Sequence, residues 1–341
     1  MRFSSTLLRL LLKMAFMLLI VHGVLAAVGA QPVRQPQAYL PLVLGLNQRP
    51  TPAPTILPPT ATPTAEPTPT PAPSADPVLV GAGDIASCSS SGDEATANLL
   101  DGIAGTVFTL GDNVYNSGTA AKFATCYDPS WGRHKARTRP AVGNHEYHVA
   151  GATGYFDYFG AAAGDRTQGY YSYNLGAWHI VVLNSTCAKV AGGCGAGSAQ
   201  EQWLRRDLAA HPARCTLAYW HHPLFNSGHD GNSNGMMRPI WQTLYEAGAD
   251  VVLTGHAHDY ERFAPQDADG NRDMARGIRE FVVGTGGAFF TGKGTTVPNS
   301  EVFQNHTFGV LKLTLHPTSY DWQFVPEAGK TFVDAGSADC H

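Results

Sequence analysis

Short apolar runs alternate with amphipathic segments from residue 78 to the end of the chain. Runs rich in β-branched and aromatic residues predict buried strands, which we expect at 78–83, 106–110, 170–175, 178–183, 215–220, 250–254, 279–284, 307–315 and 320–325. Amphipathic segments predict helices at 93–101, 198–209 and 236–247. Strands alternating with helices, with hairpins at Gly176-Ala177 and His316-Pro317-Thr318, predict an α/β fold of two packed mixed β-sheets flanked by helices.

Five short polar clusters interrupt this pattern. They are Gly83-Asp84, Gly111-Asp112-Asn113-Val114-Tyr115, Gly143-Asn144-His145-Glu146, His221-His222-Pro223 and Gly255-His256-Ala257-His258. Four of them directly follow a predicted strand, whereas the cluster at Gly143 follows only a weak apolar stretch at 140–142. Because the carboxyl ends of strands in an α/β sheet share one edge, we expect the clusters to meet there. So many oxygen and imidazole groups indicate a centre of two metal ions.

The acidic and phenolic side chains of these clusters are candidate ligands. Asp84 and Asp112 each follow a glycine at a strand end, where the backbone can approach closely. A lone aspartate there is often a helix cap, but two of them together with the histidines favour metal binding, and one carboxylate can bridge two cations. Tyr115 is either an ordinary wall tyrosine or a phenolate ligand. Because a phenol titrates near pH 10, a phenolate ligand requires a strongly charged ion such as ferric iron.

The tripeptide Asn144-His145-Glu146 offers three kinds of polar group in one turn. Asn144 can bind a metal through a neutral oxygen. His145 suits contact with a phosphoryl oxygen or protonation of a leaving group, because an imidazole titrates near neutral pH. We expect Glu146 to hold the His145 imidazole in place.

The remaining histidines lie at two strand ends and in one loop. Of the tandem pair His221 and His222, we expect one to face the site and the other to point away, because side chains alternate along an extended backbone. His256 and His258 lie two residues apart, which in extended backbone puts both imidazoles on one side. His229 lies in a loop after the first pair, where it either contacts substrate or is simply solvated.

The first 77 residues indicate export and a tether. Residues 1–30 have a basic start, an apolar centre and small residues at the end, as expected of a secretory signal. An uncleaved membrane anchor is the alternative. Residues 31–77 are rich in Pro and Thr and predict an extended linker, or a disordered leader without a function of its own. Residues 78–341 are long enough for one catalytic domain.

Charge and cysteine content agree with an exported protein. Removing residues 1–30 takes three basic residues from the 23 in the chain, leaving 20 against 27 acidic ones, a net charge of −7. An acidic body argues against nucleic acid as the main partner. Six cysteines allow 15 pairings; we expect Cys187–Cys194 and Cys88–Cys126 from their loops, and Cys215–Cys340 by elimination. Sequons occur at Asn184-Ser185-Thr186 and Asn305-His306-Thr307.

In order and spacing, the five clusters resemble the calcineurin-like metallophosphoesterases and, within them, the purple acid phosphatase branch. The resemblance covers roughly 78–287, and the pair Gly-Asn-His-Glu and Gly-His-x-His carries most of it. The general family has Asp-x-His at the first motif, whereas this chain has Asp84-Ile85-Ala86. The purple branch lacks that histidine and has a tyrosine three residues after the bridging aspartate, as Tyr115 follows Asp112. Ala86 departs from the glycine usual in the branch.

The resemblance implies a four-layer metallophosphoesterase-like sandwich and a role for each motif residue. One ion, ferric in that branch, would be held by Asp84, Asp112, Tyr115 and His258. A divalent ion (Zn, Mn or Fe) would be held by Asp112, Asn144, His221 and His256. His145 would stabilise the transition state and assist the leaving group, and His229 is a candidate substrate contact. His222 occupies a position that varies in the family.

We therefore expect a secreted or surface-exposed phosphatase that hydrolyses small phosphate monoesters by attack of a metal-activated hydroxide. Its partner would be a small-molecule phosphate ester, and a membrane would be involved only through an uncleaved N-terminal anchor. Three alternatives stay open: a phosphodiesterase acting on nucleotides or lipid head groups, a cell-surface binding module with a vestigial site, and a mononuclear or dizinc hydrolase.

Overall fold

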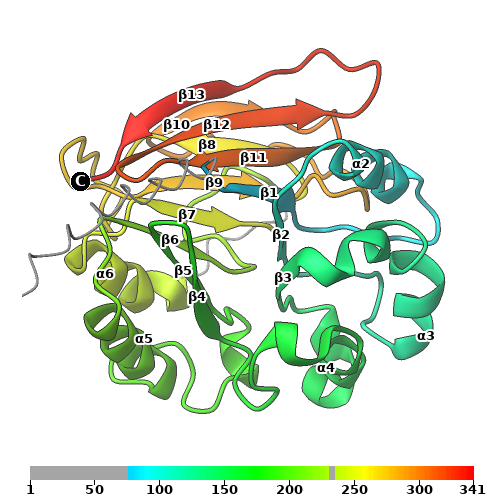
Figure 1. The fold of residues 1–341 in the computed structure, drawn as a ribbon, viewed down its shortest axis with the longest axis horizontal. Coiled ribbons are helices and arrows are strands. Elements are labelled where there is room, and N and C mark those ends of the chain that lie inside the picture. The colour runs from blue at the N-terminus through cyan, green and yellow to red at the C-terminus, as the bar shows by residue number, and fades with distance from the viewer. Residues whose placement is uncertain (1–75, 230–234) are drawn as a thin grey trace, which may run out of the picture. The chain divides into compact units, whose positions relative to one another are not determined.

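The computed structural model describes residues 76–229 and 235–341, which contain two mixed β-sheets with helices along their sides (Figure 1). The first sheet has the strand order β13 (Ala335–Asp339), β12 (Ser319–Pro326), β11 (Gly309–Leu315), β1 (Val78–Ala82), β2 (Thr106–Leu110), β3 (Thr138–Ala141). The second has the order β10 (Ser300–Gln304), β8 (Tyr260–Phe263), β9 (Arg279–Val283), β7 (Val251–Thr254), β6 (Cys215–Tyr219), β5 (Trp178–Val182), β4 (Tyr171–Leu175). The predicted fold class is confirmed.

Helices cover the parallel part of each sheet. They are α2 (Gly92–Asp101), α3 (Ala120–Lys122), α4 (Thr153–Phe159), α5 (Ala199–Ala210) and α6 (Arg238–Glu246). Shorter helical turns lie at Phe123–Tyr127, Trp131–Arg137, Glu146–His148, Ala150–Ala152, Gly160–Ala163, Cys187–Lys189 and Gly235–Met237. In Figure 1, α2, α3 and α4 lie on the side of β1–β3, and α5 and α6 lie on the side of β4–β7. No helix in the described ranges is long and apolar enough to cross a membrane.

The core lies between the two sheets and is rich in aromatic side chains. Phe108 on β2 faces Tyr219 on β6, with ring centroids 6.0 Å apart. Trp178 on β5 meets Tyr320 on β12 edge to face at 5.7 Å. Each pair joins one sheet to the other, and such pairs add to the free energy gained from burying their surface. The apolar runs recognised as strands therefore hold the sheets face to face.

The predicted elements are all present, with ends within two residues of the expected positions. Ser198 caps α5, because its Oγ accepts a hydrogen bond from the Glu201 N–H at 3.2 Å. The Glu201 carboxylate accepts a hydrogen bond from the Gly197 N–H at 3.1 Å. Four strands (β3, β8, β10, β13) and two helices (α3, α4) were not predicted.

Three disulfides confirm the expected pairing. Cys88–Cys126 ties the loop after β1 to the turn at 123–127, Cys187–Cys194 closes a short loop, and Cys215–Cys340 joins the start of β6 to the end of the chain.

The sequon at Asn184 does not suit glycosylation of the folded protein. Its side chain is fully buried and donates hydrogen bonds to Tyr147 Oη at 2.8 Å and to the Gln168 carbonyl at 3.1 Å. The predicted signal and most of the predicted linker lie outside the described residues.

Glu280→Gln is expected to stabilise the protein at neutral pH and to change its stability little near pH 4. Glu280 on β9 is fully buried, and burial raises the pKa of its carboxyl well above the usual range. Because the folded state keeps a proton that the unfolded state loses above about pH 4.3, stability falls as pH rises toward the folded pKa, by up to about 1.4 kcal/mol per pH unit. Glutamine does not titrate and removes this slope.

Urea unfolding from pH 4 to 7.5 would measure this effect. Glu94→Gln, which removes a carboxylate from the surface, controls for the loss of one charge. An unchanged pH slope in Glu280→Gln would show that this carboxyl does not control the acid-side stability.

Candidate metal centre

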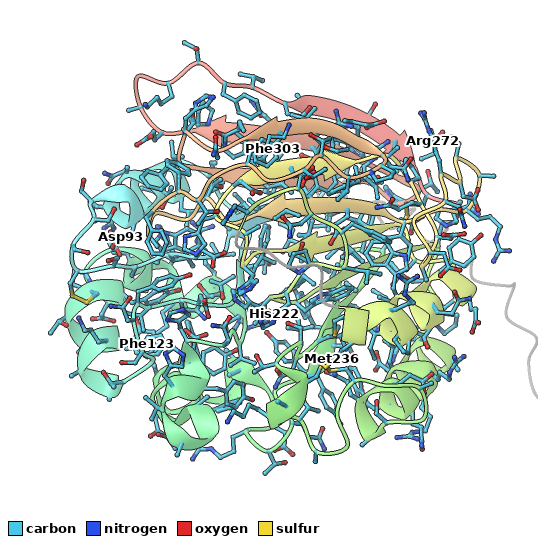
Figure 2. All side chains as sticks on the ribbon, turned by 180° about the vertical axis from the view of Figure 1, so that it is seen from behind. Asp93, Phe123, His222, Met236, Arg272 and Phe303 are labelled. Carbon is cyan, nitrogen blue, oxygen red and sulfur yellow. A yellow bond between two sulfur atoms is a disulfide. The ribbon has the colours of Figure 1, made fainter. Side chains whose placement is uncertain are left out.

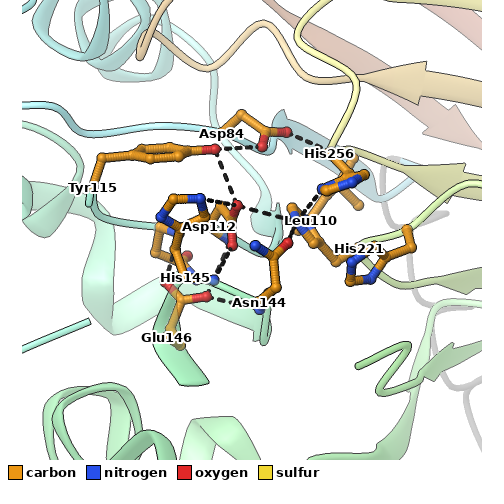
Figure 3. Close-up of polar contacts among 12 residues, drawn as sticks. Asp84, Leu110, Asp112, Tyr115, Asn144, His145, Glu146, His221 and His256 are labelled. Atoms are coloured by element: carbon orange, nitrogen blue, oxygen red, sulfur yellow. Dashed lines mark hydrogen bonds and ion pairs between the residues drawn. The ribbon is translucent and has the colours of Figure 1, made fainter. Parts of the chain in front are cut away.

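The seven predicted ligands gather at the carboxyl ends of five strands, and we refer to them as the donor set. Figure 3 labels all of them except His258. Asp84 follows β1, Asp112 and Tyr115 follow β2, Asn144 follows β3, His221 follows β6, and His256 and His258 follow β7. Four donors therefore come from the first sheet and three from the second. The weak apolar stretch before Gly143 also belongs to a strand end, because Thr138–Ala141 pairs with β2 in parallel. Pro140 is tolerated there because β3 is an edge strand.

Tyr115 contacts the three other residues in one half of the donor set. Its Oη lies 2.7 Å from Asp84 Oδ1, 3.1 Å from Asp112 Oδ2 and 3.0 Å from His258 Nε2. His258 Nε2 is also 3.4 Å from Asp84 Oδ1. Two carboxylates, a phenol and an imidazole thus direct a donor atom to one small volume.

His221 joins the other half. Its Nε2 lies 3.2 Å from Asp112 Oδ2, 3.0 Å from Asn144 Oδ1 and 3.3 Å from His256 Nδ1. Asp112 Oδ2 therefore contacts both Tyr115 and His221, and Asp112 lies in the middle of the group in Figure 3.

The backbone of the donor set is strained. Asp84, Asp112 and His256 have positive φ values of 59°, 46° and 68°, a left-handed conformation that costs a non-glycine residue on the order of 1–3 kcal/mol. His256 and His258 both reach the site, but the extended backbone expected between them is absent, because His256 turns the chain. Gly143 allows the close approach of two segments, since a Cβ there would lie 2.2 Å from Asp112 Oδ1.

Backbone carbonyls orient two of the imidazoles. His221 Nδ1 lies 2.7 Å from the Leu110 carbonyl, and His258 Nδ1 lies 2.9 Å from the Phe289 carbonyl. A carbonyl only accepts, so both Nδ1 atoms carry a hydrogen, and both Nε2 atoms face the site. No motif in the sequence signals these partners. The glycines at 284–287, just after β9, are the one hint that another loop approaches this edge.

Glu146 has a different task from the one expected. Its carboxylate accepts the backbone N–H groups of Asp112, Asn113 and Gly143 at 3.0, 2.8 and 2.7 Å, and so locks the loops after β2 and β3 together. The His145 imidazole is held by the Asn116 carbonyl, which lies 2.8 Å from Nδ1. Burial, together with the Asp112 charge, raises the pKa of Glu146 to about 7.

His222 does not point away from the site, contrary to the expectation for a tandem pair. Its ring centroid lies 4.3 Å from that of His256, and its Nδ1 lies 2.9 Å from Ser185 Oγ. In Figure 2, which labels it, His222 lies near the middle of the view. One ring nitrogen from each of His221, His222 and His256 lies within 4.8 Å of the other two. The prediction from alternating side chains failed here, because the pair lies beyond the end of the strand.

The two candidate catalytic histidines differ in position. His145 lies beside the donor set: its Nε2 is 3.8 Å from Asp112 Oδ2, and its backbone N–H donates to Asp112 Oδ1 at 2.8 Å. Its side chain is 24% exposed, so it also borders solvent. His229 is exposed, and its N–H donates to the Gly292 carbonyl at 2.7 Å. A role for His229 in substrate contact stays a prediction.

The charges of the donor set suit cations. Burial raises the pKa of Asp84, and burial with the charges of Asp112 and Asp84 raises the pKa of Tyr115 well above 10. Burial also opposes ionisation of Asp112, but His221 and His145 hold the pKa of this carboxyl below its usual range. Burial alone would lower the pKa of His221, but the nearby Asp112 carboxylate raises it to about 9.

Among the described residues, the ion pairs of Asp84 and Asp112 come only from histidines, and no lysine or arginine supplies the missing charge. Donor atoms of Asp84, Asp112 and His221 lie within 4.8 Å of one another. Buried carboxylates, a phenol, an amide oxygen and imidazoles with few protein cations nearby fit a metal centre, because a bound cation favours the charged form of each acid.

Comparisons with known proteins agree with this geometry. The family model described as calcineurin-like phosphoesterase matches residues 78–260. Purple acid phosphatase 15 of Arabidopsis thaliana is 29% identical over 150 residues, which are 39% of this chain and 27% of that protein. Probable purple acid phosphatase 20 of the same plant is 35% identical over 109 residues, 30% of this chain and 24% of that protein. The chain thus spans about a quarter of the length of these relatives.

Solved structures share the fold at low sequence identity. The purple acid phosphatase PPD1 from yellow lupin (Lupinus luteus) seeds superposes with a TM-score of 0.60 at 18% identity, covering 80% of this chain and 55% of that one. GAP50, the anchor in the inner membrane complex of Plasmodium, gives a TM-score of 0.59 at 12% identity, covering 79% and 90%. Since an enzyme and an anchor share this fold, the chemistry has to be argued from the donor set.

Proposed function

This chain belongs to the calcineurin-like phosphoesterase family, and on that premise we propose that residues 78–341 form a catalytic domain of the purple acid phosphatase type that hydrolyses phosphate monoesters. The observation that carries the proposal is Tyr115, whose Oη contacts Asp84, Asp112 and His258 at once. A phenol among two carboxylates and an imidazole suits a highly charged ion. We also propose that residues 1–30 are a secretion signal and 31–77 a linker that holds the domain away from a surface.

Each metal would take ligands from both sheets. A ferric ion would be held by Asp84, Asp112, Tyr115 and His258. A divalent ion (Zn, Mn or Fe) would be held by Asp112, Asn144, His221 and His256, with Asp112 shared. When bound, two such ions lower the pKa of water and offset charge on the phosphoryl group.

The chain's own residues orient the substrate and handle protons. The His145 N–H holds Asp112 Oδ1, which leaves Oδ2 to face the centre. The Asn116 carbonyl fixes the His145 ring with Nε2 directed toward the centre. When Nε2 is also protonated, the imidazolium can hydrogen-bond a phosphoryl oxygen and pass its proton to the departing alkoxide. Glu146 keeps the turn that carries His145 against the loop of Asp112.

Tyr115→Phe is expected to abolish a visible absorption band of the purified protein. Tyrosinate on ferric iron gives a charge-transfer band, and phenylalanine cannot supply the oxygen. The measurement is metal analysis with a visible spectrum on protein purified without chelators, followed by assays with monoester and diester model substrates. Tyr127→Phe is the matched control, since Tyr127 is a fully buried tyrosine outside the donor set.

One iron and one divalent ion per chain, with a band lost only in Tyr115→Phe, would support the proposal. Two divalent ions and no colour would contradict the ferric assignment and make the diester assays the first priority. A protein that binds no metal after reconstitution would contradict the enzymatic proposal.

A further inference from the structure

Phe289 exposes an aromatic ring at the edge of the candidate metal centre. The residue is 48% exposed, one of four large hydrophobic residues in the described ranges with so much surface in contact with solvent. Its ring centroid lies 4.2 Å from that of His258 and 5.7 Å from that of Tyr115. The exposed ring therefore adjoins two members of the donor set.

The backbone around Phe289 is held on both sides. The Ala288 N–H donates to the Asp84 carbonyl at 3.0 Å, the Phe289 carbonyl accepts from His258 Nδ1 at 2.9 Å, and the Thr291 N–H donates to the His258 carbonyl at 3.3 Å. The next residue, Phe290, stacks on Phe308 with ring centroids 4.2 Å apart. These contacts fix the loop, so the exposure of Phe289 is built into the fold and does not result from a loose segment.

Phe289 and the proposed proton donor, His145, contact the same tyrosine ring. The Tyr115 ring contacts His145 on one side, with centroids 4.5 Å apart, and Phe289 on another. A phosphate at the metal centre would present its leaving oxygen to His145. The group attached to that oxygen would then pass within reach of the Phe289 ring.

We propose that Phe289 is a binding platform for the leaving group, and that the preferred substrates are phosphate monoesters whose leaving group carries an aromatic ring. The proposal rests on the proposed monoesterase function. A ring stacked or placed edge to face on Phe289 gains an interaction that a saturated ring of similar size lacks, corresponding to about a 2- to 10-fold preference. Either leaving group also gains free energy of binding by covering the exposed Phe289 ring, and this gain is common to both.

The test compares phenethyl phosphate with cyclohexylethyl phosphate, whose leaving alcohols match except for aromaticity. The quantity measured is the ratio of the two kcat/KM values, in which any general damage to the metal centre cancels. The wild-type ratio is expected to favour phenethyl phosphate about 2- to 10-fold. Phe289→Leu, which keeps apolar bulk against His258, should bring the ratio close to one, and Phe289→Tyr should preserve it.

Val333→Ala is the matched control, because Val333 is likewise exposed, at 59%, and should leave the ratio as in the wild type. An equal loss for both esters in Phe289→Leu, with the ratio kept, would overturn the platform and leave Phe289 only a support for His258. A wild-type ratio near one would also overturn it.

Failure of the proposed function is distinguishable from failure of this inference. If the metal-loaded wild type hydrolyses neither ester, the monoesterase proposal fails. The platform is then tested by calorimetric binding of phenylphosphonate and cyclohexylphosphonate. Tighter binding of the phenyl compound, lost in Phe289→Leu, would support it, and equal affinities would overturn it.

Discussion

Asp112→Asn is expected to remove both metal ions and to abolish phosphate ester hydrolysis. Asp112 Oδ2 contacts Tyr115 Oη at 3.1 Å and His221 Nε2 at 3.2 Å, so this one carboxylate links the two halves of the donor set. An asparagine in its place is neutral and presents an amide nitrogen that cannot ligate. Loss of an outer hydrogen-bond partner of a ligand already costs about 10- to 100-fold, so the loss of a shared ligand should exceed 100-fold.

Metal content per chain and kcat/KM on one monoester would test this expectation together. Asp93→Asn is the matched control: Asp93 is a buried aspartate on α2 that accepts a hydrogen bond from Ser130 Oγ at 2.6 Å, and Figure 2 shows it well to one side of His222. Full metal content in Asp112→Asn would contradict the shared role of this carboxylate.

His145→Ala is expected to retain both metals but to lower turnover by about 100- to 10,000-fold, the usual contribution of a positioned acid or base. His145 hydrogen-bonds Asp112 through its backbone N–H, which alanine keeps, while its imidazole packs against the Tyr115 ring and borders solvent. Deleting the ring therefore removes a proton donor and leaves the ligands in place.

The dependence on the leaving group separates this role from a purely structural one. A proton donor matters most for a poor leaving group, so the loss should be larger for an alkyl phosphate than for an activated aryl phosphate. Similar losses for both esters would argue against proton transfer by His145. Loss of metal from His145→Ala would show that the residue supports the ligands, and retention of full turnover would remove it from the mechanism.

The donor set could be predicted because each of its members except Asn144 lies in a short motif directly after a clear apolar run. Asp112 and Tyr115 are three residues apart, and His256 and His258 two, so local sequence carries both their identity and their spacing. The topology of parallel strands then brings these motifs to one edge. Local sequence does not reveal which distant residues contact these motifs in the folded protein.

The orientation of Glu146 and His222 could not be predicted, because it depends on contacts between segments far apart in the chain. Glu146 binds backbone N–H groups of the preceding strand's loop, and every residue type has such a group. His222 turns toward His256 because Ser185, 37 residues earlier, holds its ring. Residue identity at these positions carries no signal of either contact.

Three of the four strands that were not predicted share a physical cause, whereas the fourth, β8, lies inside the second sheet. β3 contains Arg139 and Pro140, and β13 runs Ala335–Asp339 with mostly exposed residues. Both are edge strands, as is β10. An edge strand pairs on one side only and can be short or polar, so it lacks the apolar run by which the inner strands were identified.

The origin of the ligands in both sheets has a consequence for how the protein matures. Asp84, Asp112, Tyr115 and Asn144 belong to one sheet and His221, His256 and His258 to the other. The proposed coordination shell would therefore be complete only after the two sheets have docked, and ion capture would mark the end of assembly. A ligand that binds only the folded protein increases its free energy of unfolding in proportion to the logarithm of the ligand concentration. Metal supply would thus govern the lifetime of the folded protein as well as its chemistry.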